Sequence, residues 1–134
     1  MSNTRASLSA VTIEENILFG GGSISSGSYS SLVEVYNGSL TKSTISNLNV
    51  ARHSLGSTSI GEHAIFCGGR TNEGYSNIVD AYNSKLTKIS SVSPLTTGRS
   101  ESTATFIGNY ALIGGGIGAD GNLFKALSSI EVYN

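Results

Sequence analysis

Residues capable of chemistry are few in this chain, and their spacing matches no catalytic or metal-binding set. The two histidines, His53 and His63, lack the His-x-x-x-His spacing that a metal site on one helix face requires. The single cysteine, Cys67, precedes a glycine pair in an apolar run, which predicts a small buried residue rather than a nucleophile. Glycine triplets at residues 20–22 and 114–116 lack the Gly-Lys-Ser/Thr of a phosphate loop. The sequence therefore predicts a protein with no metal, no cofactor and no enzyme activity.

Three arginines recur at a fixed interval and form the most regular set of charged residues. Arg5, Arg52 and Arg99 are separated by 47 residues each time. Guanidinium groups gathered in a ring bind carboxylates and other anions well, because each offers several donors in a fixed plane. A structural role fits the same regularity, with each arginine tying neighbouring repeats together through backbone carbonyls. The sequence leaves both interpretations open.

The arginines belong to an internal repeat that covers the chain. Each repeat contains the arginine, then an apolar run that ends in glycines, then a Tyr-Asn pair. The runs are residues 17–22, 64–69 and 111–116, and the pairs are residues 36–37, 82–83 and 133–134. Such self-similarity is typical of stacked units that each contribute one supersecondary motif. We interpret residues 1–134 as a single domain with repeats at approximately 5–51, 52–98 and 99–134.

Each repeat is predicted to form short β-strands. Apolar runs bounded by glycine are typical of buried strands, and the segments before each Tyr-Asn pair alternate between apolar and acidic residues. No window shows the helical period together with caps. The strands predicted in the first two repeats are residues 6–13, 17–19, 32–36 and 40–46, and then 53–60, 64–66, 78–82 and 86–92. The third repeat is predicted to have three strands, including residues 111–113 and 129–133.

The composition excludes several classes of partner. Eight basic and nine acidic residues give a net charge of −1, so there is no basic surface for nucleic acid or for an anionic membrane. Apolar residues make up 38% and charged residues only 13%, which favours a folded domain over disorder. No signal peptide and no apolar stretch long enough to span a membrane is visible. We expect a cytoplasmic protein with neither nucleic acid nor membrane as a partner.

The repeat resembles the kelch repeat. A kelch unit has a diglycine that closes its second strand, a Tyr before an Asp or Asn in its third strand, and an Arg before the next unit. These features correspond here to the glycine pairs, the Tyr-Asn pairs and the three arginines. The tryptophan of the fourth kelch strand is missing, and Lys42 and Lys88 lie near its place. The chain thus resembles a divergent kelch-like family without tryptophan, of the kind found in bacterial or phage-associated proteins.

This resemblance implies an all-β fold of three kelch-like four-stranded blades, the third incomplete, which together make half of a β-propeller. Without tryptophan, packing between blades is expected to depend on Tyr36, Tyr82, Leu40 and Leu86. A closed propeller needs about four to eight blades, and three alone would leave two apolar faces exposed. Two copies related by a two-fold axis would supply six, so a homodimeric six-bladed propeller is expected. The alternative is that the chain is a fragment of a longer propeller.

The resemblance also implies a binding site. It places Arg5, Arg52 and Arg99 around the mouth of a central channel, beside the loops at residues 23–31, 70–77 and 117–128. These loops differ in length and sequence while the strands repeat, as binding loops on a rigid scaffold do. The loop residues expected to contact a ligand are Tyr29, Arg70, Tyr75 and Phe124.

Three functions are compatible with such a site. The first is a non-enzymatic scaffold that recognises a protein segment or an acidic ligand on the loop face. The second is a carbohydrate-binding propeller, because Tyr29, Tyr75 and Phe124 suit stacking against sugar rings. The third and least favoured is a sugar-modifying enzyme such as a mutarotase, with Glu101 beside Arg99 as its acid or base.

Overall fold

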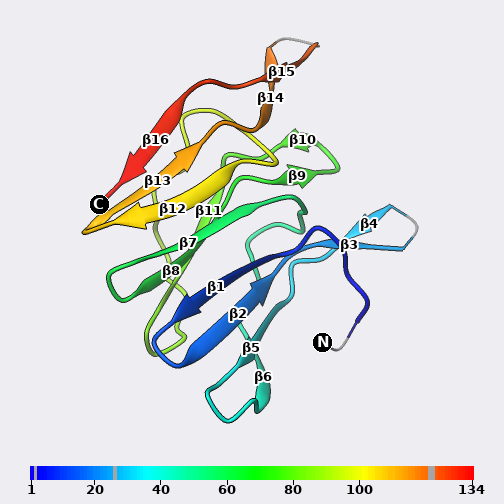
Figure 1. Ribbon diagram of the computed structural model, residues 1–134. Coiled ribbons are helices and arrows are strands. Elements are labelled where there is room, and N and C mark those ends of the chain that lie inside the picture. The colour runs from blue at the N-terminus through cyan, green and yellow to red at the C-terminus, as the bar shows by residue number, and fades with distance from the viewer. Residues whose placement is uncertain (2, 26, 121–122) are drawn as a thin grey trace.

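The described residues of the chain form three antiparallel sheets of three or four strands, which lie side by side in chain order, and three two-stranded sheets (Figure 1). The computed structural model describes residues 1, 3–25, 27–120 and 123–134, and these residues form strands and turns without any helix. The all-β class predicted from the sequence is therefore confirmed. Within the described residues, no helix exists that is long and apolar enough to cross a membrane.

The sheets follow the three repeats. The first sheet consists of β1 (Ser9–Ile13), β2 (Asn16–Gly20), β5 (Val33–Tyr36) and β6 (Lys42–Ile45), in that spatial order. The second consists of β7 (Gly56–Ile60), β8 (His63–Cys67) and β11 (Val79–Asn83), with β8 in the centre. The third consists of β12 (Thr103–Ile107), β13 (Tyr110–Gly114) and β16 (Ile130–Tyr133), with β13 in the centre.

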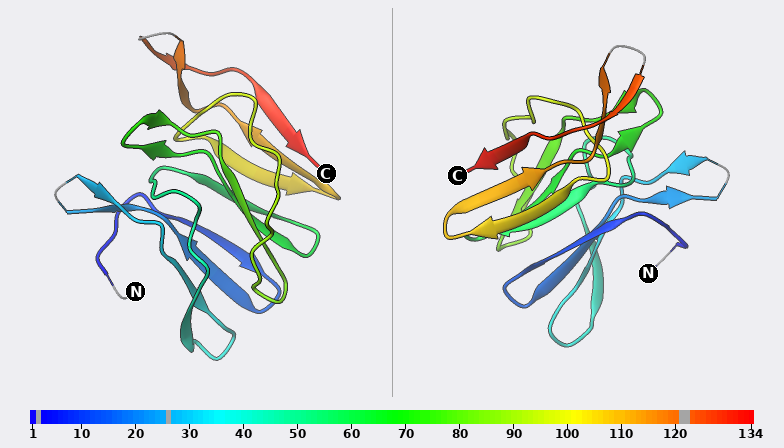
Figure 2. Two further views of the ribbon diagram at one scale, coloured as in Figure 1. Left: turned by 180° about the vertical axis from the view of Figure 1, so that it is seen from behind. Right: turned by 45° about the horizontal axis from the view of Figure 1, so that its top comes forward.

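A two-stranded hairpin follows the glycine pair of every repeat. The hairpins are β3 (Ser23–Ile24) with β4 (Ser28–Tyr29), β9 (Arg70–Thr71) with β10 (Gly74–Tyr75), and β14 (Ile117–Asp120) with β15 (Leu123–Ala126). The sequence predicted loops here, because strands of two to four residues are too short to show a recognisable alternation. All three hairpins project from the same side of the sheets, which we call the hairpin side (Figures 1 and 2).

The prediction of a fourth strand at residues 86–92 is wrong. This segment makes a single bridge, Tyr82 to Lys88, whereas β6 in the first repeat pairs with β5 over four residues. After that bridge, Ile89 and Val92 pack against the apolar core between the second and third sheets. Partial burial of these two side chains takes the chain away from the edge of the sheet, so the ladder of backbone hydrogen bonds does not continue.

Two apolar cores join the sheets, one at each junction. The strands of the second sheet supply side chains to both, because successive residues point to opposite faces. Phe66 and Tyr82 pack with Leu18 and Val35 of the first sheet, whereas Cys67 packs toward the third. The chain therefore buries its apolar residues between sheets and needs no covering helix.

Tyrosines of the repeat also connect neighbouring sheets. The Tyr82 hydroxyl donates a hydrogen bond to the Ser46 carbonyl at 2.7 Å, and the Tyr133 hydroxyl donates to the Ser93 carbonyl at 3.0 Å. Leu40 is 77% exposed within the single chain, in the turn between β5 and β6, so the packing role expected for it between blades stays a prediction. Its counterpart Leu86 packs partly against the first core.

Candidate functional site

All three repeated arginines form buried ion pairs with an acidic residue of their own repeat. The pairs are Arg5 with Glu34 at 2.5 Å, Arg52 with Asp80 at 2.8 Å, and Arg99 with Glu131 at 2.8 Å. The side chains of the three arginines have no exposed surface, and among the acids only Glu131 is slightly exposed. Each guanidinium group is therefore neutralised inside the protein.

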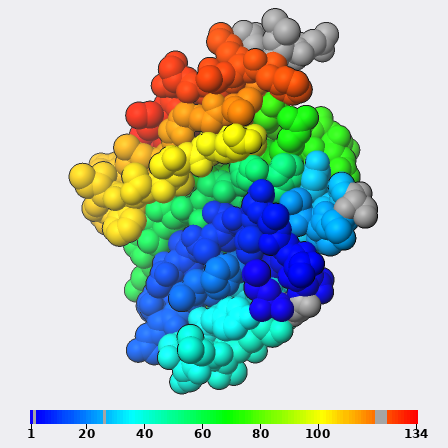
Figure 3. Space-filling model, turned by 45° about the vertical axis from the view of Figure 1, so that its right-hand side comes forward, coloured from blue at the N-terminus to red at the C-terminus, as the bar shows by residue number. Residues whose placement is uncertain are grey.

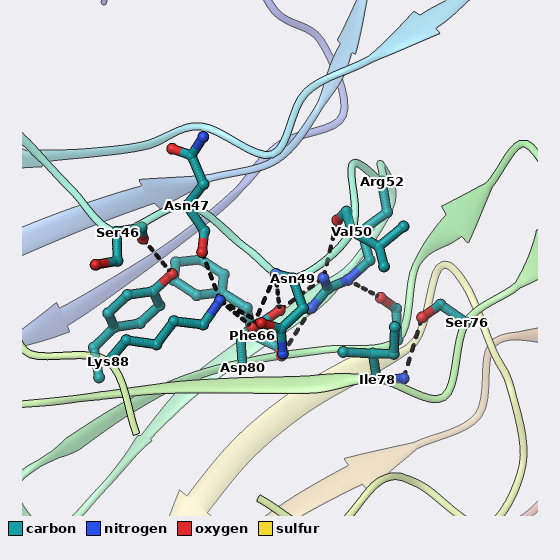
Figure 4. A network of polar contacts seen from close by, with 12 residues as sticks. Ser46, Asn47, Asn49, Val50, Arg52, Phe66, Ser76, Ile78, Asp80 and Lys88 are labelled. Carbon is teal, nitrogen blue, oxygen red and sulfur yellow. Dashed lines mark hydrogen bonds and ion pairs between the residues drawn. The ribbon is translucent and has the colours of Figure 1, made fainter. Parts of the chain in front are cut away.

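The Arg52 network shows how one such pair is built (Figure 4). The Nε of Arg52 donates to the Gly68 carbonyl at 2.7 Å, while Nη1 lies against the Asp80 carboxylate. Asp80 also accepts a hydrogen bond from the backbone N–H of Asn49 at 3.1 Å and lies 2.8 Å from the Lys88 ammonium group. Because Asn49 belongs to the first repeat, the buried carboxylate links the first repeat to the second.

The glycine pairs allow the backbone of one repeat to approach the arginine of the next repeat closely. Gly68 has a φ of +65°, and a Cβ at this position would lie 2.5 Å from the Arg99 carbonyl, so only glycine fits. The next residue, Gly69, donates its N–H to that same carbonyl at 2.7 Å. The arginine side chain thus anchors its own repeat, while its main chain accepts a hydrogen bond from the preceding repeat. The expected ties between repeats exist in two forms, because the Arg99 main chain accepts from Gly69, and Arg52 Nη1 donates to the Val50 carbonyl of the first repeat at 3.2 Å.

These contacts correct the expectation that Arg5, Arg52 and Arg99 line a ligand-binding surface. Their side chains are buried and paired with carboxylates, so a ligand cannot reach them, and the structural interpretation is the one that the geometry supports. The sequence alone did not indicate the carboxylate partners. The signal was present nevertheless, because Glu34, Asp80 and Glu131 recur in phase with the arginines.

The buried arginines do position the hairpin side. The residue after each arginine forms a β-bridge with the first strand of the hairpin in its own repeat. The bridges are Ala6 with Ser23, His53 with Arg70, and Ser100 with Ile117. The three hairpin segments consequently lie in a row along one face of the molecule (Figure 3).

Three of the loop residues predicted from the sequence meet on this side. The guanidinium carbon of Arg70 lies 5.0 Å from the ring centroid of Tyr75 and 5.4 Å from that of Phe124. Arg70 Nη1 also donates a hydrogen bond to the Tyr75 hydroxyl at 3.1 Å. The two rings are 6.1 Å apart in an edge-to-face arrangement. The guanidinium group and the two rings thus contact one another in a triangle, and the cation–π contacts hold the charge of Arg70 in place.

A cavity of about 240 Å³ opens beside this cluster, at the junction of the second and third repeats. Its lining residues are His53, Arg70, Tyr75, Ser100, Glu101, Ile117 and Phe124. The sequence did not place His53, Ser100 or Ile117 in a site, and their position directly after an arginine or a glycine pair was the available signal. Tyr29 lies outside the lining, with its ring 4.5 Å from that of His53.

The ionisable groups that the structure describes around the cavity are not joined in ion pairs like those of the three buried arginines. Burial lowers the pKa of His53, and the Arg70 guanidinium lowers it further, while Glu101 acts in the opposite direction. Both causes favour the neutral imidazole of His53, so Arg70 is the cation at the cavity. In the part of the chain that the structure describes, no carboxylate forms an ion pair with Arg70. The described residues also contain no cluster of three or more His, Cys, Asp or Glu side chains suited to a metal ion.

The fold and the site thus define an all-β protein built from repeated small antiparallel sheets with a cavity between two of them. No family model and no curated protein matches the chain. The solved structure of YjhT is similar to it, with a TM-score of 0.81 at 16% sequence identity. The match covers 99% of this chain and 46% of YjhT, so the chain spans about half the length of that protein. At this level of identity the similarity concerns the fold alone.

Proposed function

We propose that the chain is half of a kelch-like β-propeller and acts as a non-enzymatic scaffold that binds an acidic group of a protein ligand on its hairpin side. In this proposal each sheet is one blade, and the hairpin after its glycine pair contributes to the binding face. The recurrence of the arginine, the glycine pair and the Tyr-Asn pair in every sheet supports the propeller. A second copy of the chain would bring the number of blades to six.

The observation that carries the binding proposal is that Arg70 lies at a cavity and forms no ion pair with a carboxylate among the described residues. The repeated arginines each have a carboxylate partner inside the protein, whereas Arg70 lines a cavity that a ligand can enter. The adjacent rings of Tyr75 and Phe124 both contact its guanidinium group. A carboxylate in the cavity would complete the missing ion pair through charge-assisted hydrogen bonds, and the aromatic rings would contact the apolar part of the ligand.

An array of peptides with and without Asp and Glu tests this proposal. We expect the protein to retain acidic peptides, and we expect Arg70→Gln to lose this binding while keeping the fold. Lys85→Gln is the matched control, because Lys85 is an exposed cation in the turn after β11. Equal binding by wild type and Arg70→Gln would contradict the proposal, as would retention of neutral peptides alone.

A carbohydrate ligand is the second candidate, and the exposure of Phe124 favours it. This ring is 72% exposed and meets Tyr75 edge to face, which leaves an aromatic surface for a sugar. A glycan array distinguishes the two candidates. Binding of neutral glycans that is lost in Phe124→Ala but retained in Arg70→Gln would support the carbohydrate ligand. Exchange between the anomers of a bound sugar, abolished in Glu101→Gln, would support a mutarotase instead of a scaffold.

A further inference from the structure

The outer face of the third sheet is apolar and uncovered, although its counterpart in the first sheet is buried. Ile107, Ile130 and Val132 are 70%, 62% and 59% exposed. The residues at the same positions of the first repeat are Ile13, Val33 and Val35, and the second sheet covers all three. We call the exposed surface of Thr103, Ile107, Leu112, Ile130 and Val132 the C-side face. Its composition is that of a surface built to be covered by another sheet.

The first sheet carries the complementary surface, which we call the N-side face and which consists of Ala10, Ile17, Phe19 and Tyr36. Phe19 occupies the position that Phe66 has in the second repeat. Phe66 packs against Gly20 so closely that a Cβ on this glycine would lie 2.8 Å from the Phe66 ring. Gly114 holds the position of Gly20 in the third sheet, and there the nearest atom to such a Cβ is 3.6 Å away, on Ile130. The C-side face thus has room for a phenylalanine ring.

Backbone hydrogen bonds between repeats form a series that points to the same contact. The N–H of Gly22 donates to the Arg52 carbonyl at 2.9 Å, and the N–H of Gly69 donates to the Arg99 carbonyl at 2.7 Å. The next donor in this series is Gly116, and the arginine that begins the first repeat is Arg5. The third repeat therefore presents the donor side of the junction, and the first repeat presents the acceptor side.

We propose that the C-side face binds the N-side face of a second copy of this chain, with Phe19 of that copy against Gly114 and its Arg5 carbonyl accepting the N–H of Gly116. This inference rests on the proposed propeller. The second copy is the fitting occupant because both halves of the junction are present on one chain. YjhT is also about twice as long, so its fold has room for two copies of this chain. Two such junctions related by a two-fold axis close a ring of six sheets.

Solution mass measured by light scattering during size-exclusion chromatography, across a dilution series, is the first test. We expect twice the chain mass of 13.8 kDa for the wild type and a single chain for Val132→Glu. Val132 is largely exposed within one chain, so this change leaves the fold of the chain intact. Phe106→Glu is the matched control, because Phe106 is an exposed apolar residue of the same sheet, and as the neighbour of Ile107 in β12 it points to the face opposite the C-side face.

Engineered cysteines provide a second test that does not depend on affinity. A Cβ on Gly56 would lie 3.4 Å from the Cβ of Ala104 across the second junction, close to the span of about 3.5–4.5 Å that a disulfide requires. The equivalent pair at the proposed junction is Thr103 of one copy and Ala10 of the other. We expect Ala10→Cys with Thr103→Cys to give a covalent dimer that a reductant separates.

The control for cross-linking is Ser9→Cys with Ser57→Cys. These hydroxyls lie 2.6 Å apart across the first junction, so this disulfide forms within one chain. Under denaturing conditions without reductant, the covalent mass of this variant stays that of a single chain. Cys67 is buried and does not compete. A ladder of cross-linked chains would support contact between the faces and overturn the closed ring.

A wild-type monomer at all concentrations without a covalent dimer would overturn the proposal and assign the C-side face to further repeats of a longer chain. The ligand proposal is tested separately, by peptide binding to the monomeric Val132→Glu variant. Binding that persists in this variant would leave the scaffold proposal standing even where the dimer fails.

Discussion

Arg52 Nη1 lies 2.8 Å from Asp80 Oδ2, and neither side chain has any surface exposed to solvent. Breaking a buried pair of this kind strongly lowers the free energy of unfolding, because removal of one partner leaves the other charged and without water. The same relationship joins Arg5 to Glu34 and Arg99 to Glu131. The most regular feature of the sequence therefore serves the fold, through buried ion pairs within each repeat.

Replacing Arg52 by Ala should lower the free energy of unfolding by about 3–5 kcal/mol, since Asp80 would remain buried without its main partner. Asp80→Ala should cost a similar amount. The double variant should cost clearly less than the sum of the two, because it removes both charges. Urea unfolding followed by circular dichroism measures all three, and strict additivity would contradict the pairing.

The pH dependence of stability should include a contribution from Glu131. Burial raises the pKa of this carboxyl, but hydrogen bonds from Thr96 and Thr97 and the charge of Arg99 together bring it below its ordinary value of 4.5. A lowered pKa in the folded state stabilises the protein above the unfolded pKa, and this stabilisation is lost as the pH falls through the folded pKa. The stability difference between wild type and Glu131→Gln should therefore shrink between pH 5 and pH 3 in chemical denaturation.

Gly68→Ala should destabilise the chain more than Gly61→Ala. Both glycines have positive φ, at +65° and +52°, so the strain on an alanine backbone is matched. A Cβ at Gly68 would meet the Arg99 carbonyl at 2.5 Å, whereas nothing lies within 4 Å of a Cβ at Gly61. We expect the difference in unfolding free energy to be about 1–3 kcal/mol. Equal costs in urea titrations would contradict the close approach.

The Cys67 thiol should be inert in the folded protein. Burial raises its pKa to about 12, and its side chain has no exposed surface, so no thiolate is available near neutral pH. We expect no reaction with Ellman's reagent at pH 8 until denaturant opens the second core. Rapid labelling in native buffer would show instead that the junction of the second and third sheets opens readily.

The His53 imidazole should report on the charges around the cavity. Its pKa should lie below 6.5 in an NMR titration, with burial as the largest cause. Arg70→Gln should raise this pKa, because a nearby positive charge is removed. Glu101→Gln should lower it further, because a negative charge is removed. A His53 titration that neither substitution changes would contradict the arrangement of the cavity.

Much of the fold could be predicted from the sequence, because strand residues recur at nearly constant intervals with the same chemical character. The hairpins were missed because two-residue strands such as Arg70–Thr71 leave no alternation to detect. The cavity was only partly predictable. Arg70 and Phe124 lie in different repeats, 54 positions apart, and only the docking of the second sheet on the third brings them together.

The side chain and the main chain of each repeated arginine have different roles, and this difference affects how a repeat can be added by duplication. The side chain clamps its own repeat to a carboxylate within it, and the main chain binds the neighbour. A tandem duplication of some 47 residues therefore supplies a complete unit at once, with its clamp and both joining surfaces. Since the hairpins take no part in the clamp, each duplicated copy is free to diverge at its tip and acquire a specificity of its own.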